Sequence, residues 1–88
     1  MKSDREIYLR SFSTNLKALR KAKGYTQERL AHEADFSYKY LQELEGGKKC
    51  PSLIIVIRLC KALNVSLDKI LEGLYKTEKD SGKDYLSG

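Results

Sequence analysis

The chain has 88 residues, enough for one domain with a small hydrophobic core. Its 17 lysines and arginines outnumber its 12 aspartates and glutamates, and the formal charge of +5 favours a polyanionic partner. Hydrophobic residues make up 41% of the sequence, which excludes wholesale disorder, and the longest apolar run, residues 53–57, is too short to span a membrane.

The sequence lacks the residue patterns that are typical of catalytic and metal-binding sites. Cys50, Cys60 and His32 are not spaced as metal ligands, so we expect no metal site. We expect no catalytic residue and no cofactor, because one histidine supports no nucleophile–base pair and no glycine-rich phosphate loop is present. Residues 1–6 are too charged for a signal peptide, and two cysteines in a chain without one suit a reducing compartment. The sequence therefore predicts a cytoplasmic protein that is not an enzyme.

The first predicted helix covers residues 4–23. It begins with a capping box, in which Ser3 precedes Glu6 by three residues, and Gly24 ends it after a basic last turn. Apolar residues recur at helical spacing between these signals: Leu9, Phe12, Leu16 and Leu19. A restart near Ser11 is the alternative, so residues 1–11 are expected to be an amino-terminal extension that continues the helix.

Four shorter helices are predicted next, over residues 27–34, 38–45, 53–63 and 67–72. Each follows a hydroxyl residue that can cap it, namely Thr26, Ser37, Ser52 and Ser66. Because no alternating strand pattern is found, residues 12–73 are predicted to form an all-α domain. Residues 74–88 are rich in lysine, acidic residues, serine and glycine, and we expect a flexible tail.

Residues 27–46 have the pattern of two helices that cross closely. Small or apolar residues are needed where two such backbones approach, and a short break is needed between them. Phe36 fills the break, and the inner faces are supplied by Leu30, Ala31, Ala34, Leu41 and Leu44. Ala31 is the position least free to vary, because a larger side chain there would push the helices apart.

Three stretches together resemble the Cro/cI-type helix-turn-helix family: LKALRKAKGYTQERLA, SYKYLQELEGGKKCPSL and LCKALNVSLDKIL. The resemblance covers residues 12–71 and implies a five-helix, lambda-repressor-like domain whose second and third helices form the helix-turn-helix. It also implies a partly buried ion pair between Arg20 and Glu45, with two surface charges as the alternative. Asp35 departs from the family, which usually has a left-handed glycine there, but aspartate tolerates positive φ better than most residues.

The resemblance places the third helix in the major groove of DNA. We expect its outward residues to contact bases: Ser37, Tyr38, Lys39, Gln42 and Glu43. Lys39 can donate to guanine and Gln42 can pair with adenine, whereas the charge of Glu43 also repels phosphates. Phosphate contacts are expected from Gln27, Tyr40, Lys48 and Lys49.

One such domain reads only a few base pairs, so we expect a homodimer on a two-fold symmetric operator in double-stranded DNA. Ile54 and Ile55 are apolar where the family has polar residues, and the candidate interface residues are Ile54, Ile55, Leu74 and Tyr75. The alternative is that the extension around Ile7 and Tyr8 covers Ile54 or Ile55.

The sequence therefore predicts a sequence-specific DNA-binding transcriptional regulator, with repression as its expected effect. The alternative is a protein-interaction module of the same fold, such as an antitoxin or an adaptor. Salt-sensitive affinity for DNA distinguishes the two functions.

Overall fold

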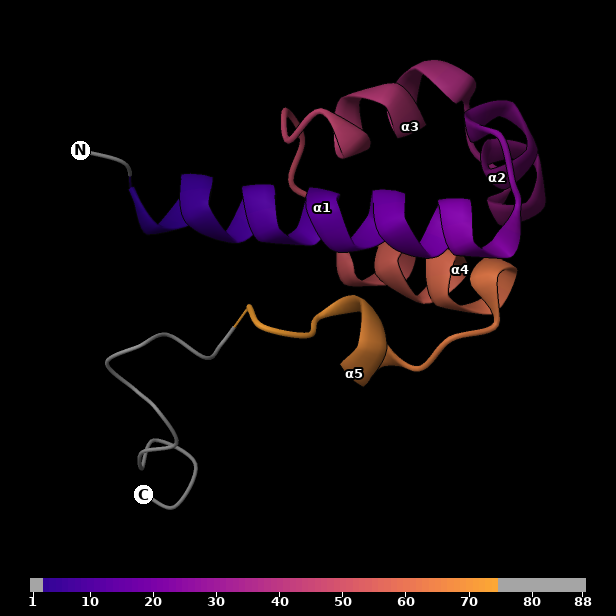
Figure 1. Ribbon diagram of the computed structural model, residues 1–88. Helices are drawn as coiled ribbons and strands as arrows, with labels where there is room; N and C mark the ends of the chain where they lie inside the picture. The colour runs from indigo at the N-terminus through magenta and orange to yellow at the C-terminus, as the bar shows by residue number, and fades with distance from the viewer. Residues whose placement is uncertain (1–2, 75–88) are drawn as a thin grey trace.

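The computed structural model describes residues 3–74, which form five helices and no strand (Figure 1). The helices are α1 (Asp4–Lys23), α2 (Gln27–Ala34), α3 (Tyr38–Glu45), α4 (Leu53–Leu63) and α5 (Leu67–Ile70). The all-α prediction is confirmed, and the first four helices have the predicted bounds. α1 runs without a break from Asp4, so there is no restart near Ser11.

Every helix begins at a hydroxyl residue with extended backbone. The side chains of Ser3, Thr26, Ser37, Ser52 and Ser66 each accept a hydrogen bond from the backbone N–H three residues later, at 3.0–3.2 Å. These bonds satisfy one of the N–H groups that a helix start leaves without an intrahelical partner. The side chain of Glu6 accepts in return from the N–H of Ser3, which completes the predicted capping box.

Only α5 is shorter than predicted, ending at Ile70 and not at residue 72. The Asn15 side chain of α1 donates to the carbonyl oxygens of Ile70 and Glu72, each at 2.9 Å. A longer helix would use the Ile70 carbonyl as the acceptor for the Leu74 N–H. That N–H instead donates to the Leu71 carbonyl at 3.0 Å, so the chain after Ile70 closes in turns.

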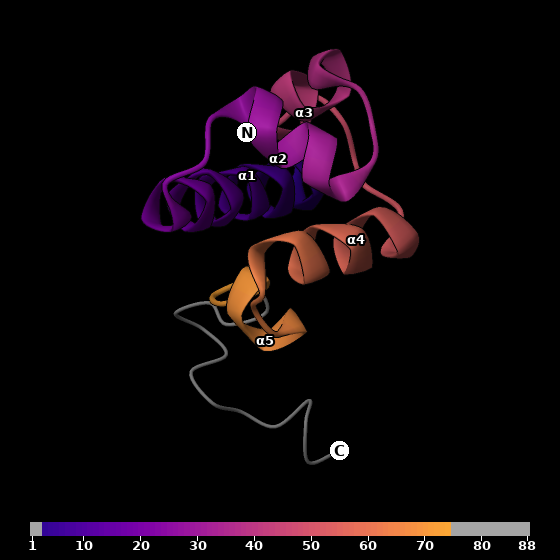
Figure 2. The ribbon, with the colours of Figure 1, turned by 90° about the vertical axis from the view of Figure 1, so that its right-hand side faces the viewer.

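One core unites the five helices. Both views place α2 and α3 on one side of α1, with α4 and α5 toward the other (Figures 1 and 2). The largest fully buried side chains come from every helix: Leu16, Leu30, Leu41, Leu44, Leu59 and Ile70. Burying each of these side chains contributes roughly 1.5–3 kcal/mol to stability relative to leaving it exposed. Detaching any one helix from the core would therefore cost a large part of the free energy of folding.

The turn between α2 and α3 depends on Asp35. Its backbone is left-handed, with φ 64° and ψ 49°, as the sequence predicts for this position. The Phe36 N–H donates back to the Ala31 carbonyl at 3.0 Å, which closes the end of α2. Arg58 of α4 donates to the Asp35 carbonyl at 3.4 Å, so α4 also holds the turn in place.

The first turns of α1 extend beyond α3 and α4 (Figure 1). Ile7 and Tyr8 are 47% and 44% exposed there, and Ile54 on α4 remains 64% exposed. The extension therefore does not cover Ile54, and that part of the alternative is wrong. None of the helices in residues 3–74 combines the length and the apolar character needed to cross a bilayer.

Candidate nucleic-acid interface

The face of α3 that points away from the core is polar. Leu41 and Leu44 are completely buried, while Tyr38, Lys39 and Gln42 are exposed. Lys39 and Gln42 are three residues apart, so they are neighbours on the helix surface. The helix thus presents a phenol, an ammonium and an amide side by side, which are groups able to hydrogen-bond to base edges. Ser37 is exposed at the helix start, and Glu43 is half-buried at the edge of this face.

Close packing against α2 fixes the direction in which this face points. Ala31 and Ala34 are 2% and 3% exposed, and their small side chains let α3 approach α2. The rings of Phe36 and Tyr40 meet edge to face, with centroids 5.3 Å apart and planes at 82°. Tyr40, expected to contact phosphate, is therefore half-buried and also serves in packing.

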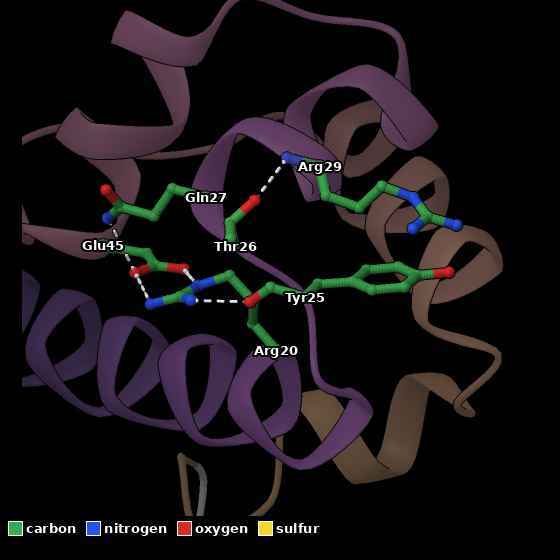
Figure 3. A network of polar contacts seen from close by, with 6 residues as sticks. All are labelled: Arg20, Tyr25, Thr26, Gln27, Arg29 and Glu45. Carbon is green, nitrogen blue, oxygen red and sulfur yellow. Dashed lines mark hydrogen bonds and ion pairs between the residues drawn. The ribbon is translucent and has the colours of Figure 1, made fainter.

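Arg20 and Glu45 lie together at the meeting point of three helices (Figure 3). Arg20 Nε donates to Glu45 Oε2 at 2.7 Å and Nη2 donates to Oε1 at 3.0 Å, while Nη1 donates to the Tyr25 carbonyl at 2.8 Å. The two side chains are only 10% and 2% exposed. The geometry is that of the buried ion pair that the resemblance implies. The burial of both side chains excludes the alternative that Arg20 and Glu45 are two surface charges.

Gln27, the first residue of α2, joins the same network. Its side-chain nitrogen donates to Glu45 Oε1 at 3.0 Å, so the start of α2 is fixed to the end of α3 (Figure 3). This bond was not predicted, because nothing in the local sequence pairs residues 18 positions apart. A helix start also offers backbone N–H groups and a positive dipole end, which suit an anion.

Cations surround the start of α2 and the loop after α3. The Arg29 guanidinium and the Lys23 ammonium lie 4.6 and 5.7 Å from the ring centroid of Tyr25. Lys48 and Lys49 are exposed in the loop, and the Lys48 N–H donates to the Glu43 carbonyl at 2.9 Å. The structure thus places positive charge at both ends of the helix-turn-helix. Arg29 was not singled out from the sequence.

The predicted dimer residues do not share one surface. Ile55 and Leu74 are half-buried and pack against the core of their own chain, and Tyr75 lies outside the described residues. Ile54 is 64% exposed, together with Leu53 at 66% and Ile57 at 41%. These three residues, here called the α4 patch, are exposed, whereas Val56 and Leu59 of the same helix are buried. The apolar run of residues 53–57 indicated that one face of this helix lies outside the core, but it did not indicate which face.

The two cysteines differ in environment. Cys50 is exposed in the loop after α3, and Cys60 is buried in the core, where burial raises the pKa of its thiol. A protonated, buried thiol behaves as a small hydrophobic group. Among the described residues, no group of three His, Cys, Asp or Glu side chains is placed to hold a metal ion.

Most of the described part of the chain is similar in sequence to known proteins. Residues 16–70 match the family model described as Helix-turn-helix. Over 53 residues the chain is 42% identical to an uncharacterized HTH-type transcriptional regulator, y4dJ, of Sinorhizobium fredii, covering 60% of this chain and 69% of that protein. Over 55 residues it is 40% identical to an uncharacterized HTH-type transcriptional regulator, YazB, of Bacillus subtilis, covering 62% and 80% of the two chains.

Two solved structures resemble the fold. The restriction-modification controller protein C.AhdI from Aeromonas hydrophila superposes with a TM-score of 0.69 at 32% identity, covering 70% of this chain and 94% of that one. The clp gene regulator ClgR from Corynebacterium glutamicum superposes with a TM-score of 0.70 at 33% identity, covering 73% and 68% of the two chains.

Proposed function

This chain belongs to the Cro/cI-type helix-turn-helix family of transcriptional regulators, and from that membership we propose that it binds an operator as a homodimer and represses transcription. The family and the lambda-repressor-like fold were both predicted from the sequence and are confirmed. The proposal concerns how this chain performs regulation: which residues read the DNA, how the subunits assemble, and in which compartment. We propose the cytoplasm, where DNA and reduced thiols coexist.

The observation that carries the proposal is the exposed polar face of α3. It is set on a helix whose other side is completely buried, so its direction is rigid. We propose that Lys39 donates to guanine O6 and N7 and that Gln42 pairs with adenine N6 and N7 in the major groove. Ser37, Tyr38 and Glu43 flank these two residues as the remaining proposed base contacts.

Phosphate contacts would hold α3 in the groove. We propose that Gln27 and the start of α2 grip one phosphate, and that Lys48, Lys49 and the Tyr40 hydroxyl grip the other strand. The bond from Gln27 to Glu45 supports this assignment, because it holds Gln27 in place before DNA arrives. Such preorganisation reduces the entropy cost of binding.

The α4 patch is the proposed dimer interface. Leu53, Ile54 and Ile57 expose large apolar side chains on one helix face, which is costly in water and is relieved by a second copy. Two copies would present two α3 helices to half-sites about one helical turn apart, and the operator would be two-fold symmetric. This narrows the predicted interface from four residues to Ile54 and its exposed neighbours.

The experiment is a selection of binding sites from random duplex DNA, followed by titration of the winning site with wild type and Lys39→Ala. A two-fold symmetric site, weakened by roughly 1–3 kcal/mol in Lys39→Ala, is the expected result. Gln42→Ala should relax the preference at a different base pair. Lys69→Ala, on α5 and away from the α4 patch, is the control and should leave the affinity unchanged.

The same exposed α4 patch favours a second candidate function, a protein-interaction module such as an antitoxin or adaptor. On that alternative the patch binds a different protein and α3 reads no DNA. If the selection enriches no site and binding is weak and insensitive to salt, this second function replaces the first.

A further inference from the structure

We infer that the α1 helix carries a phosphate-binding track outside the helix-turn-helix, formed by Arg10, Lys17 and Lys21 with Arg5 at its far end. The occupant is the sugar–phosphate backbone of the operator DNA, contacted in addition to the phosphates proposed at α2 and the α3–α4 loop. This inference rests on the proposed function, because it extends the same protein–DNA surface.

The spacing of the track follows from helix geometry. Arg10, Lys17 and Lys21 are seven and four residues apart, so at 3.6 residues per turn they share one face of α1. All three side chains are exposed. Arg10 and Lys21 are separated by about 16 Å along the helix axis, at about 1.5 Å per residue. Several consecutive phosphates fit within that length, because they recur about every 3.4 Å along the axis of each strand.

The track lines a shallow, open groove. Two adjoining hollows of about 350 and 580 Å³ lie between α1 and the end of α3, and they share Ser13, Lys17 and Glu45. Lys21 lines the smaller hollow, and Arg5, Arg10 and the backbone of Gly46 and Gly47 line the larger one. Together the two hollows follow α1 from its last turn to its first turn.

The charge of the groove is positive once its internal pairs are taken into account. Four cations, Arg5, Arg10, Lys17 and Lys21, line it against two carboxylates, Glu6 and Glu45. Glu45 is already neutralised by Arg20, at 2.7 and 3.0 Å, and Glu6 accepts from the N–H of Ser3 in the capping box. The cations therefore face an opening that suits a polyanion.

The track also starts beside a proposed phosphate anchor. Glu45, which lines both hollows, is the carboxylate that holds the side chain of Gln27 at 3.0 Å. A strand gripped at Gln27 would thus have Lys21 and Lys17 next to it. This continuity with the α2 anchor favours DNA over an unrelated acidic protein as the occupant.

The test compares two variants that each remove one positive charge. Lys17→Gln lies on the track, where Lys17 lines both hollows, and Lys69→Gln lies on α5, on the other side of α1 (Figure 1). For the selected operator, the slope of log affinity against log salt should become shallower by about 0.9 in the track variant, because one lost phosphate contact contributes about 0.9. The control variant should keep the wild-type slope.

Two further readouts separate a phosphate track from other effects. Hydroxyl-radical footprinting should show backbone positions that wild type protects and the track variant does not. The affinity ratio between operator and scrambled DNA should stay constant, because phosphate contacts carry no sequence information. A track variant whose slope and footprint match the control overturns the inference and leaves the proposed function standing. Wild type that shows no salt-dependent binding overturns the proposed function, and the track with it.

Discussion

Arg20 of α1 and Glu45 of α3 form a bidentate ion pair almost completely shielded from water, with side chains 10% and 2% exposed. Glu45 also accepts from Gln27 of α2, so one carboxylate connects three helices. A buried charge is tolerated only while its partner is present, because the cost of desolvation is otherwise not offset.

Replacing Glu45 by alanine should therefore lower the free energy of unfolding by roughly 3–5 kcal/mol, since Arg20 would be left buried without its partner. Urea or guanidinium unfolding measures the change. The exposed pair Arg29–Glu33, with N···O 3.1 Å and side chains 56% and 39% exposed, gives the control. Glu33→Ala should cost only about 0.5 kcal/mol. Equal costs at the two sites would mean that the Arg20–Glu45 pair is screened by solvent.

Enlarging Ala31 should disturb the crossing of α2 and α3. Its side chain is 2% exposed where the two helices approach, so Ala31→Leu is expected to destabilise the fold by about 1–3 kcal/mol through overpacking. Ala22→Leu, on the exposed side of α1, is the matched control and should be nearly neutral. Thermal unfolding of the two variants compares them. A tolerated leucine at position 31 would show that the helices can separate at little cost.

The left-handed residue between α2 and α3 gives a prediction about the turn. Asp35 has φ 64°, a conformation that costs a residue other than glycine about 1–2 kcal/mol, and most for β-branched side chains. Asp35→Gly should be at least as stable as wild type, and Asp35→Val should lose about 1–2 kcal/mol. The Asp35 carbonyl still accepts from Arg58 in both variants, so the comparison isolates the backbone. A valine variant as stable as the glycine variant would contradict the turn geometry.

Ile54 and its neighbour Ile55 should respond differently to the same substitution. Ile54→Glu places a charge on the exposed α4 patch, so we expect a monomer of unchanged stability in sedimentation at micromolar concentration. Ile55→Glu would put the charge against the core and should destabilise the fold. Ala22→Glu, on exposed α1, is the control for added charge and should remain dimeric. A wild-type protein that is already monomeric would reject the α4 patch as a dimer interface.

The two cysteines should react with an alkylating reagent one after the other. Cys50 is exposed, whereas Cys60 is buried and the raised pKa of its thiol keeps it protonated at neutral pH. Mass spectrometry after alkylation under native conditions should find one adduct per chain. The second adduct should appear only when denaturant opens the core. Two rapid adducts on the folded protein would mean that the packing around Cys60 opens readily.

The helix starts were predictable because their chemistry is local. A hydroxyl side chain and an N–H three residues later define each start, and Ser37 and Ser52 can be recognised without knowing the rest of the fold. The end of α5 was not predictable in this way. It depends on Asn15, which bonds to Ile70 across 55 positions of the sequence.

In the candidate site, too, some features follow from the local sequence and others depend on packing between distant residues. The outward positions of α3 follow from the pattern of Leu41 and Leu44, which the structure buries as predicted. The exposed side of α4 did not follow from its sequence, since residues 53–57 are all apolar and give no contrast between faces. Packing against the core decided that Ile55 is half-buried and Ile54 is exposed. The base contacts themselves stay a prediction, since they depend on DNA.

The five hydroxyl caps also have a kinetic consequence. Each helix can settle its own starting point within a few residues, before any distant part of the chain has been found. Folding then requires mainly that neighbouring short helices, joined by short connections, dock against one another. Helical domains rich in such local interactions fold in microseconds to milliseconds. A newly made copy would therefore spend little time with its core side chains exposed to water, which limits aggregation while a regulator accumulates.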